Sequence, residues 1–332
     1  MTAGSSPENR IVVQHALGDP AQALRLERES VPEPGPGEVL VELVLAPINP
    51  AELLMLRGQY GYRDTVPPVP RRTGVEGVGR VVGGAVDVVP EGTEVLLSGL
   101  PPVMADYRVA PADRLVALPP GAEAEQAAVS FINLQCVLLN LRHPSLQREG
   151  WLIQNAANSA YGRAVDKVAH RKGYRVVNVV RSEQAAAELA DAAGPVVVDG
   201  PDLRERVLEQ TAGAEPTLAL DAVAGASTGR LADTLAAGST VLTYGLLSGQ
   251  PCSVDTRLVV FRGITLAGFW LPQARAETPS ELLGQISREA LDLAAEGVAA
   301  VPVAARYGLD DAVRAFEHAD RSGRNGKIVV VR

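Results

Sequence analysis

Two patterns of apolar and polar residues divide the chain. Residues 11–120 contain short runs rich in Val and Leu, such as 39–45 and 77–82. Gly and Pro separate these runs, most densely at 32–37, and such residues are typical of turns between strands. This pattern predicts a small β-barrel in the first third of the chain.

Beyond residue 123, short apolar strands alternate with helical segments. Alternation of this kind predicts a parallel, doubly wound sheet. The last apolar run can return to the first domain as a strand. The expected strands are 151–154, 174–180, 195–198, 218–223, 240–244, 265–269 and 327–331, and the first two expected helices are 164–172 and 183–193.

Composition narrows the classes of function. A chain of 332 residues is long enough for two domains. Its net charge of −8 argues against a nucleic-acid or membrane-surface partner. No run approaches the roughly 18 apolar residues of a membrane span. A polar start and only two cysteines, Cys136 and Cys252, predict a cytoplasmic protein.

The turn after the strand at 151–154 is a candidate phosphate-binding loop. Dinucleotide folds usually have G-x-G-x-x-G there, and this chain has Ala157, Ser159 and Gly162 at the three glycine positions. These small residues keep most of the clearance, and a helix N-terminus offers N–H groups to an anion. An ordinary strand-to-helix turn is the alternative interpretation.

The end of the next strand indicates which dinucleotide would bind. NAD-binding folds usually carry an acidic residue there for the ribose 2′-hydroxyl. This strand instead ends in Arg181, with no acidic residue before it. A guanidinium group can grip a 2′-phosphate with two hydrogen bonds, so the sequence favours NADPH. A solvated arginine in a loop is the alternative.

Several segments are more specific than any glycine pattern. They are the turn 154–159 before Gly162, the strand end 178–181, the segments 49–52 and 57–61, and the segments 243–245 and 268–271. Together they resemble the mitochondrial-type trans-2-enoyl thioester reductases, which are zinc-independent medium-chain dehydrogenase/reductases.

The resemblance implies an α/β protein of two domains. Residues 1–122 and 302–332 would form a GroES-like β-barrel catalytic domain, and residues 123–301 a doubly wound Rossmann domain that binds NADPH. It also implies a homodimer joined through the cofactor domains. The substrate would be an enoyl thioester of CoA or acyl carrier protein.

The resemblance also assigns the site residues. Tyr60 occupies the position of the catalytic tyrosine. The implied cofactor-binding residues are Asn133, Asn158, Ser159, Ala160, Tyr161, Arg181, Ser182, Glu183, Tyr244, Gly245, Leu246, Leu247, Phe269, Trp270, Leu271, Pro272 and Lys327.

The expected chemistry suits a tyrosine. Hydride addition to the β-carbon of an enoyl thioester places negative charge on the carbonyl oxygen, and the α-carbon must then take a proton. A tyrosine hydroxyl, whose ordinary pKa is about 10, stays protonated at neutral pH and can donate. The alternative for Tyr60 is a half-buried aromatic residue in a loop.

No metal is expected. Zinc-dependent members of this superfamily often carry a Gly-His-Glu segment, and here Gly74-Val75-Glu76 has lost the histidine. Two cysteines cannot form a four-cysteine zinc lobe. The four histidines show no ligand spacing and are expected at the surface or as caps: His15, His143, His170 and His318.

Some positions depart from the family pattern. Cys136 stands where the family usually has threonine, and Tyr161 replaces a small aliphatic residue. These departures keep open a quinone or enone reductase, a specialised pathway enzyme, or a non-catalytic NADPH-binding relative. The insertion at 70–72 is expected to be a solvated loop, with binding of a CoA or carrier-protein phosphate as its alternative.

Overall fold

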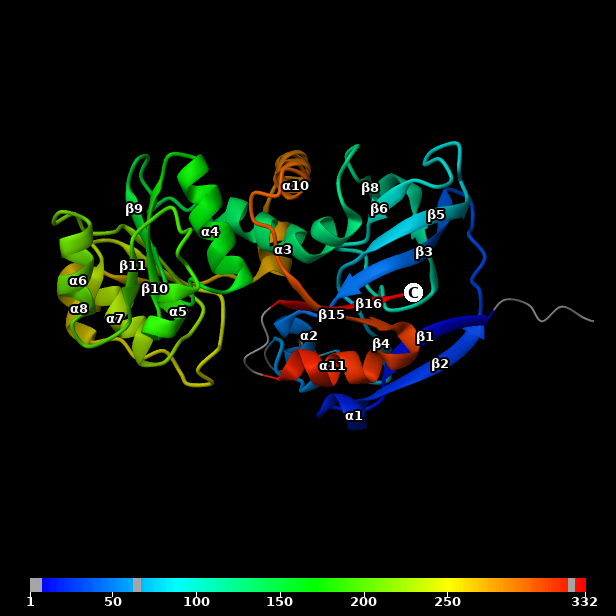
Figure 1. Cartoon of the computed structure of the whole chain (residues 1–332), viewed down its shortest axis with the longest axis horizontal. Coiled ribbons are helices and arrows are strands. Elements are labelled where there is room, and N and C mark those ends of the chain that lie inside the picture. Colours follow the sequence, from blue (N-terminus) through cyan, green and yellow to red (C-terminus); the bar gives the residue numbers. More distant parts are fainter. Residues whose placement is uncertain (1–7, 62–66, 322–325) are drawn as a thin grey trace, which may run out of the picture. The chain divides into compact units, whose positions relative to one another are not determined.

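The computed structural model describes residues 8–61, 67–321 and 326–332 (Figure 1). They form two compact units, Met1–Ile132 with Ala294–Arg332, and Asn133–Leu293. The boundaries lie ten residues later and eight residues earlier than the sequence suggests. Gln126 explains part of this shift, because its side chain exchanges two hydrogen bonds with the backbone of Val301, at 3.0 and 3.1 Å.

Strand β3 (Glu38–Pro47) is central to the first unit. Its residues alternate between buried and partly exposed positions, and Val39 and Val41 are fully buried. This period of two is what the sequence pattern predicts for a strand with one face on a core. Strand β3 pairs with three others: β5 (Val78–Gly84), β7 (Tyr107–Pro111) and β16 (Lys327–Val331). The last strand of the chain therefore returns to the first unit, as expected.

The other elements of the first unit complete two sheets. Within the described residues, the larger sheet has seven strands and the smaller has three, in the order β2-β1-β4. Helix α11 (Ala312–Asp320) buries Ala315 and Phe316 in the core. The remaining elements are β1 (Glu8–Gln14), α1 (Pro20–Ala23), β2 (Leu24–Ser30), α2 (Pro50–Leu56), β4 (Arg71–Arg72), β6 (Glu94–Leu96), η2 (Ala112–Arg114), β8 (Val116–Ala117), β15 (Val303–Gly308) and η3 (Leu309–Asp311).

The expected solvated loop at 70–72 is partly wrong. Arg71 and Arg72 form the short strand β4, which pairs with β1. The Arg71 guanidinium donates to the Gln14 side chain and to the Met55 carbonyl, both at 2.8 Å. Arg72 makes an ion pair with Glu29. These partners within the chain account for the ordered backbone that the polar sequence did not reveal.

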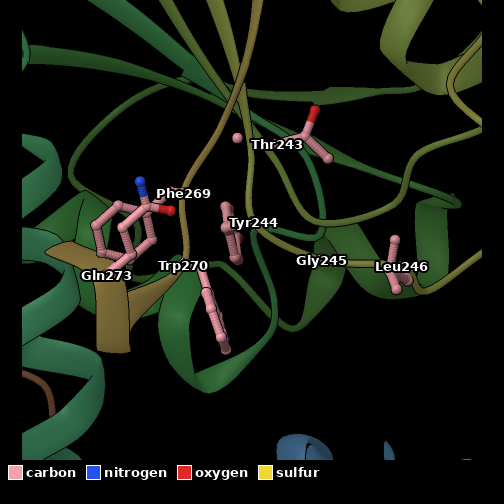
Figure 2. Close-up of a pocket in the computed structure, with 8 residues that line it drawn as sticks. Thr243, Tyr244, Gly245, Leu246, Phe269, Trp270 and Gln273 are labelled. Atoms are coloured by element: carbon pink, nitrogen blue, oxygen red, sulfur yellow. The ribbon is translucent and has the colours of Figure 1, made fainter. Parts of the chain in front are cut away.

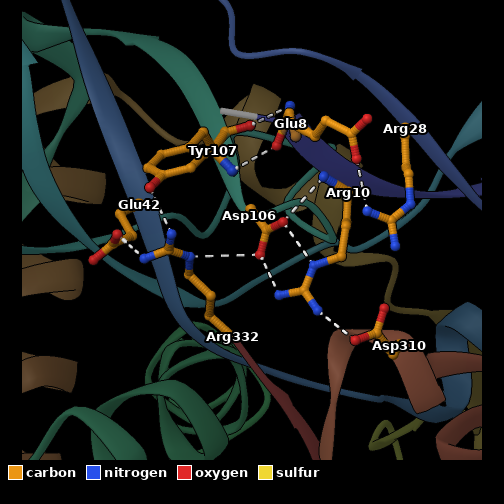
Figure 3. A network of polar contacts seen from close by, with 9 residues as sticks. Glu8, Arg10, Arg28, Glu42, Asp106, Tyr107, Asp310 and Arg332 are labelled. Carbon is orange, nitrogen blue, oxygen red and sulfur yellow. Dashed lines mark hydrogen bonds and ion pairs between the residues drawn. The ribbon is translucent and has the colours of Figure 1, made fainter. Parts of the chain in front are cut away.

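A network of charged groups joins both ends of the chain to β7 (Figure 3). The buried Asp106 carboxylate accepts from the backbone and guanidinium of Arg10, at 2.8–3.0 Å. Arg332 lies 3.5 Å from the same carboxylate, and its guanidinium covers the Tyr107 ring at 4.5 Å. A buried carboxylate is tolerated only when its oxygens are paired, so Asp106 fixes the position of both terminal segments.

The second unit contains the predicted parallel sheet. Among the described residues it has six strands in the order β11-β10-β9-β12-β13-β14, and all pairs are parallel. Helices α6 and α7 pack on one face, and Figure 1 shows α4 on the other side. The strands are β9 (Trp151–Gln154), β10 (Arg175–Val180), β11 (Val196–Val198), β12 (Leu218–Asp221), β13 (Thr240–Thr243) and β14 (Thr265–Gly268).

The helices of the second unit follow the expected alternation. No described helix is long and apolar enough to cross a bilayer. The helices are α4 (Ala160–Arg171), α5 (Glu183–Ala187), α6 (Leu203–Gln210), α7 (Ala226–Thr234), α8 (Thr256–Arg262) and α9 (Leu271–Glu277), with α3 (Ala124–Asn140) and α10 (Ser280–Ala295) at the unit boundaries.

Helix α5 is shorter than expected. The alanine-rich segment predicts a helix to residue 193, but the helix ends at Ala187. The Asp166 carboxylate accepts from the backbone N–H groups of Ala193 and Gly194, at 2.7 and 3.0 Å. This contact between distant segments holds the chain in a non-helical path and overrides the local preference of the alanines.

Candidate functional site

The turn between β9 and α4 has the geometry expected of a dinucleotide-binding loop. Ser159 caps the helix, and its hydroxyl accepts from the Gly162 N–H at 3.0 Å. A Cβ atom on Gly162 would lie 2.6 Å from the Ala157 backbone, so only glycine fits there. Gly162 thus serves close helix packing, which is the purpose of the third glycine in the usual motif.

A buried carboxylate behind this turn holds its shape. Asp221, at the end of β12, accepts from the Asn155 side chain at 2.6 Å and from the Thr228 hydroxyl at 2.7 Å. The Asn155 oxygen in turn accepts from the Ala222 N–H at 2.7 Å. The carboxyl ends of β9 and β12 are thereby locked together, next to the turn in which Ala156 has a left-handed φ of 49°.

The predicted 2′-phosphate site lies at the end of β10. Arg181 is exposed and makes no hydrogen bond or ion pair with the described residues, so its guanidinium is available to a ligand. Ser182 caps α5 through a 3.3 Å bond from the Ala185 N–H, and Glu183 is exposed. Asn158 donates to Glu188 at 3.0 Å. These positions suit a charged group, and the assignment of Arg181 to the 2′-phosphate stays a prediction.

A pocket of about 440 Å³ opens at the carboxyl ends of β13 and β14 (Figure 2). Ligands in open α/β sheets bind at this end of the strands. In the view of Figure 2 the Tyr244 ring lies between Phe269 and Leu246. Five of the predicted cofactor residues line the pocket, together with Thr243, Gly268 and Gln273: Tyr244, Gly245, Leu246, Phe269 and Trp270.

Other predicted cofactor residues do not line this pocket. Leu247 is exposed, and Leu271 and Pro272 form the first turn of α9. Asn133 is half-buried on α3, three residues before Cys136 and seven before Asn140, so the three residues share one helix face.

Tyr244, which lines the pocket, packs with its ring tilted against the ring of Tyr161. The Tyr161 and Tyr244 ring centroids are 4.4 Å apart at 46°. Asn140 donates to the Tyr161 hydroxyl at 2.7 Å, which ties α3 to the first turn of α4. Burial, with a smaller contribution from the nearby Cys136, raises the pKa of both phenols. Both hydroxyl groups therefore stay neutral and able to donate. Tyr161, which replaces a small aliphatic residue of the family, packs against Tyr244.

The first unit has a buried charged cluster next to the segment that precedes Tyr60. Asn49 donates its backbone N–H to Glu52 at 3.0 Å and its side-chain nitrogen to Glu76. Lys327 on β16 is buried and donates to the Asn49 oxygen. Its predicted approach to the cofactor stays a prediction. Burial raises the pKa of Glu52 to about 8, helped by the Glu76 charge and opposed by backbone hydrogen bonds and Lys327.

Tyr60 is half-buried four residues after the end of α2, in the first unit. Helix α2 and the cluster around Asn49 fix the start of this segment. The catalytic role of Tyr60 follows from the resemblance and stays a prediction.

The absence of a metal stays a prediction. The described part of the chain contains no group of three or more His, Cys, Asp or Glu side chains that could hold a metal. His15 pairs with Glu27, the His143 ring accepts from the Ser145 N–H, and Tyr307 bonds to His318. His170 is exposed at the end of α4.

The two units and the strand-end pocket define a two-domain medium-chain dehydrogenase/reductase. Residues 35–120 match the alcohol dehydrogenase GroES-like domain family, and residues 161–288 match the zinc-binding dehydrogenase family. The chain is 32% identical to the mitochondrial enoyl-[acyl-carrier-protein] reductase of Xenopus tropicalis, over 94% of this chain and 92% of that protein. It therefore belongs to the enoyl thioester reductase family within this class.

Solved structures agree on the fold. A Bacillus thuringiensis protein provisionally named an NADPH:quinone reductase has a TM-score of 0.88 and 27% identity, over 98% of this chain and all of that one. The complex of Etr1p with NADP and crotonyl-CoA has a TM-score of 0.84 and 22% identity, with the same coverage.

Some residues of the site were missed from sequence. Gln273 lines the pocket one helical turn after Phe269 and Trp270. The bond from Asn140 to Tyr161 was not predicted either, because it joins segments 21 residues apart. The buried Asn155 and Asp221 gave no signal beyond their places at strand ends, because their pairing joins segments 66 residues apart.

The Glu52 cluster predicts a dependence of stability on pH. The folded chain keeps a proton on Glu52 up to about pH 8, whereas the unfolded chain loses it near the ordinary value of 4.5. The free energy of unfolding should thus fall as pH rises from 4.5 to 8, by on the order of a few kcal/mol. Glu52→Gln should remove this part of the slope in denaturant titrations at pH 5, 6.5 and 8.

The exposed Glu33 provides the matched control, since Glu33→Gln should leave the slope as it is in the parent. Parallel stability curves for the parent and Glu52→Gln would show that Glu52 is ionised in the folded protein.

Proposed function

We propose that the chain reduces the carbon–carbon double bond of a 2-enoyl thioester of CoA or acyl carrier protein with NADPH. The observation that carries this proposal is the pocket at the ends of β13 and β14. It is lined by the segments that the family resemblance assigns to the cofactor, 244–246 and 269–270. The relative from Xenopus tropicalis, alike over nearly the full length, is named for this reaction.

In this proposal, residues of the second unit would bind the cofactor and Tyr60 of the first unit would supply a proton. NADPH, when bound, supplies the hydride that the β-carbon of the substrate accepts. The exposed Arg181 would hold the 2′-phosphate, and the N-terminus of α4 would face the pyrophosphate. Tyr60 would donate its hydroxyl proton toward the carbonyl oxygen or the α-carbon and regain a proton from water. The product is the saturated thioester.

A quinone or enone reductase is the second candidate. It is favoured by the likeness to the provisionally named quinone reductase, at 27% identity. The same hydride chemistry serves a quinone, whose oxygens can take their protons from water. The relatives named enoyl reductases are mitochondrial; the cytoplasmic location of this chain stays a prediction from its polar start and its two cysteines.

Arg181 should determine the choice of cofactor. We expect NADPH to bind at least tenfold more tightly than NADH, about 1.4 kcal/mol, because the guanidinium pairs with the 2′-phosphate. Arg181→Ala should remove most of this preference and leave NADH binding unchanged in fluorescence titrations. Arg148→Ala changes an exposed arginine elsewhere in the unit and should leave the preference intact. Equal affinities in the parent would contradict the assignment.

Tyr60→Phe tests the reaction itself. Removal of one donor to the developing charge should lower kcat by on the order of 10²- to 10³-fold on crotonyl-CoA, about 3–4 kcal/mol. NADPH affinity should not change, because the interaction forms mainly in the transition state. NADPH consumption should be measured with enoyl-CoA thioesters and with quinones side by side.

The control for this experiment is Tyr174→Phe, which removes a hydroxyl from the second unit and should leave turnover as it was. Activity on quinones alone, or an undiminished rate for Tyr60→Phe, would replace the enoyl reductase proposal by the second candidate.

We further propose that the chain forms a homodimer through the second unit. Within the part of the chain that the structure describes, strand β14 ends the parallel sheet and pairs with β13 alone. Leu266 on this edge is 48% exposed, and Phe261 on α8 is 80% exposed. An unpaired edge beside exposed apolar side chains is a surface that another chain can cover. A second copy can pair the same edge with itself about a twofold axis.

A charged side chain introduced on the β14 edge tests the proposed dimer. The parent should have about twice the 34.8 kDa of one chain in light scattering, and Leu266→Glu should shift it to the monomer mass. Val88→Glu, at an exposed apolar position of the first unit, should leave the mass unchanged. A monomeric parent at micromolar concentration would refute this assembly.

A further inference from the structure

The first unit buries two carboxyl groups in one polar cluster. Glu52 on α2 and Glu76, two residues before β5, are 3% and 2% exposed. Glu52 accepts from the Asn49 backbone N–H at 3.0 Å, and Glu76 accepts from the Asn49 side chain. Glu52 also receives a hydrogen bond from the backbone of Val75, the residue next to Glu76. The two carboxyl groups are therefore held close together in the interior.

The cluster contains one cation for these two carboxyl groups. Lys327 on β16 is buried and donates to the Asn49 oxygen. The charges that act on Glu52 are those of Glu76 and Lys327. Two neighbouring carboxylates in a buried site resist full ionisation, and one ammonium group can balance only one of them. One proton should therefore stay on the pair at neutral pH.

The hydrogen bonds indicate where this proton lies. The Oε2 atom of Glu52 accepts from Asn49, whereas its Oε1 atom accepts no hydrogen bond from the residues that the structure describes. A buried carboxylate oxygen without a donor is costly, but the same oxygen can carry a proton. Burial, with a contribution from the Glu76 charge, raises the pKa of Glu52 to about 8. The neutral Glu52 then has a proton to donate, and the Glu76 carboxylate of the same cluster can accept it.

Helix α2 connects this pair to Tyr60. Glu52 is in the first turn of the helix, and its contacts fix that end. At the other end, the Gln59 N–H donates to the Leu54 carbonyl at 2.8 Å. This bond attaches the residue before Tyr60 to the helix. A displacement of the start of α2 is therefore transmitted to Tyr60.

The far end of α2 has charged groups of its own. Arg57 forms an ion pair with Asp320 on α11 and lies 3.7 Å from Asp19, which precedes α1. Burial and hydrogen bonding at the start of the helix, with Glu76 and Lys327, account for the protonation of Glu52.

We propose that Glu52 and Glu76 share one buried proton and act together as positioning residues for Tyr60. While the proton is present, the pair holds the start of α2 in place. Loss of the proton to solvent leaves two negative charges close together, which repel each other and attract water. The start of α2 then moves, and Tyr60 moves with it. The positioning of Tyr60 rests on the proposed function, whereas the shared proton does not.

An infrared titration from pH 6 to 10 measures the proton directly, through the carbonyl stretching band of a protonated carboxyl group. The parent should lose one such band with a midpoint near pH 8. Glu52→Gln should lack this band. Glu76→Gln should lower its midpoint by about one pH unit, because a neighbouring negative charge no longer opposes ionisation. The exposed Glu33 provides the matched control, since Glu33→Gln should titrate as the parent does.

The turnover of crotonyl-CoA tests the positioning. In the parent, kcat should fall by on the order of 10- to 100-fold as the pH rises through 8, because a displaced donor no longer reaches the substrate. Ionisation of Tyr60 itself would act at higher pH, since the ordinary pKa of a phenol is about 10. Glu52→Gln should keep its own pH 6.5 rate up to pH 9, and at pH 9 it should bind NADPH as tightly as the parent. Melting temperatures confirm that each variant is folded.

The two measurements can contradict the inference separately. A parent without the band, or an unchanged midpoint in Glu76→Gln, overturns the shared proton. If kcat of Glu52→Gln falls with pH as that of the parent does, the positioning role is wrong and the proposed function stands. If the parent does not reduce crotonyl-CoA, the proposed function and the positioning role both fail, and the infrared titration still decides whether the proton is shared.

Discussion

The buried Asp221 carboxylate is the constraint on which the second unit depends most. It lies at the end of the central strand β12 and accepts from Asn155, Thr228 and two backbone N–H groups, those of Val223 and Ala224, at 2.6–3.0 Å. A charge in the interior is stable only when such donors surround it, so the segments that supply them cannot move independently. Two of these segments, the turn at Asn155 and the start of α7, flank the open end of the sheet. The shape of the candidate site thus depends on the hydrogen bonds that stabilise the Asp221 carboxylate.

The same principle operates in the first unit with a different result. Glu52 is buried with fewer compensating groups, and it holds a proton instead of a charge at neutral pH. Asn49 bridges this cluster to Lys327 on the returning strand β16. The segment that leads to Tyr60 is therefore attached to the end of the chain by neutral and charged groups together. In each unit buried polar side chains fix the position of particular segments, and the apolar core alone would not specify these positions.

The sequence was sufficient for features whose cause is local. Alternating burial along β3 and the succession of strands and helices after residue 150 were predictable, because each depends on residues close together in the chain. The end of α5 was not predictable, since the Asp166 carboxylate accepts hydrogen bonds from backbone N–H groups that a longer helix would have used. The pairing of Arg71 and Arg72 was not predictable either, because their partners lie 57 and 43 residues away in the chain. The place of Gln273 in the pocket was missed for the same reason, because it depends on which segments the fold brings together.

The return of β16 to the first unit also determines the order in which the units can be completed during synthesis. All six described strands of the second unit's sheet have been made by residue 268, and that unit is a continuous stretch of chain. The first unit is complete only when Phe316 has packed into its core and β16 has paired with β3. A nascent or truncated chain would carry a finished cofactor unit next to an incomplete β-sheet with an open edge. Such edges pair readily with other chains, so the interval before release from the ribosome is when this protein is most prone to aggregate.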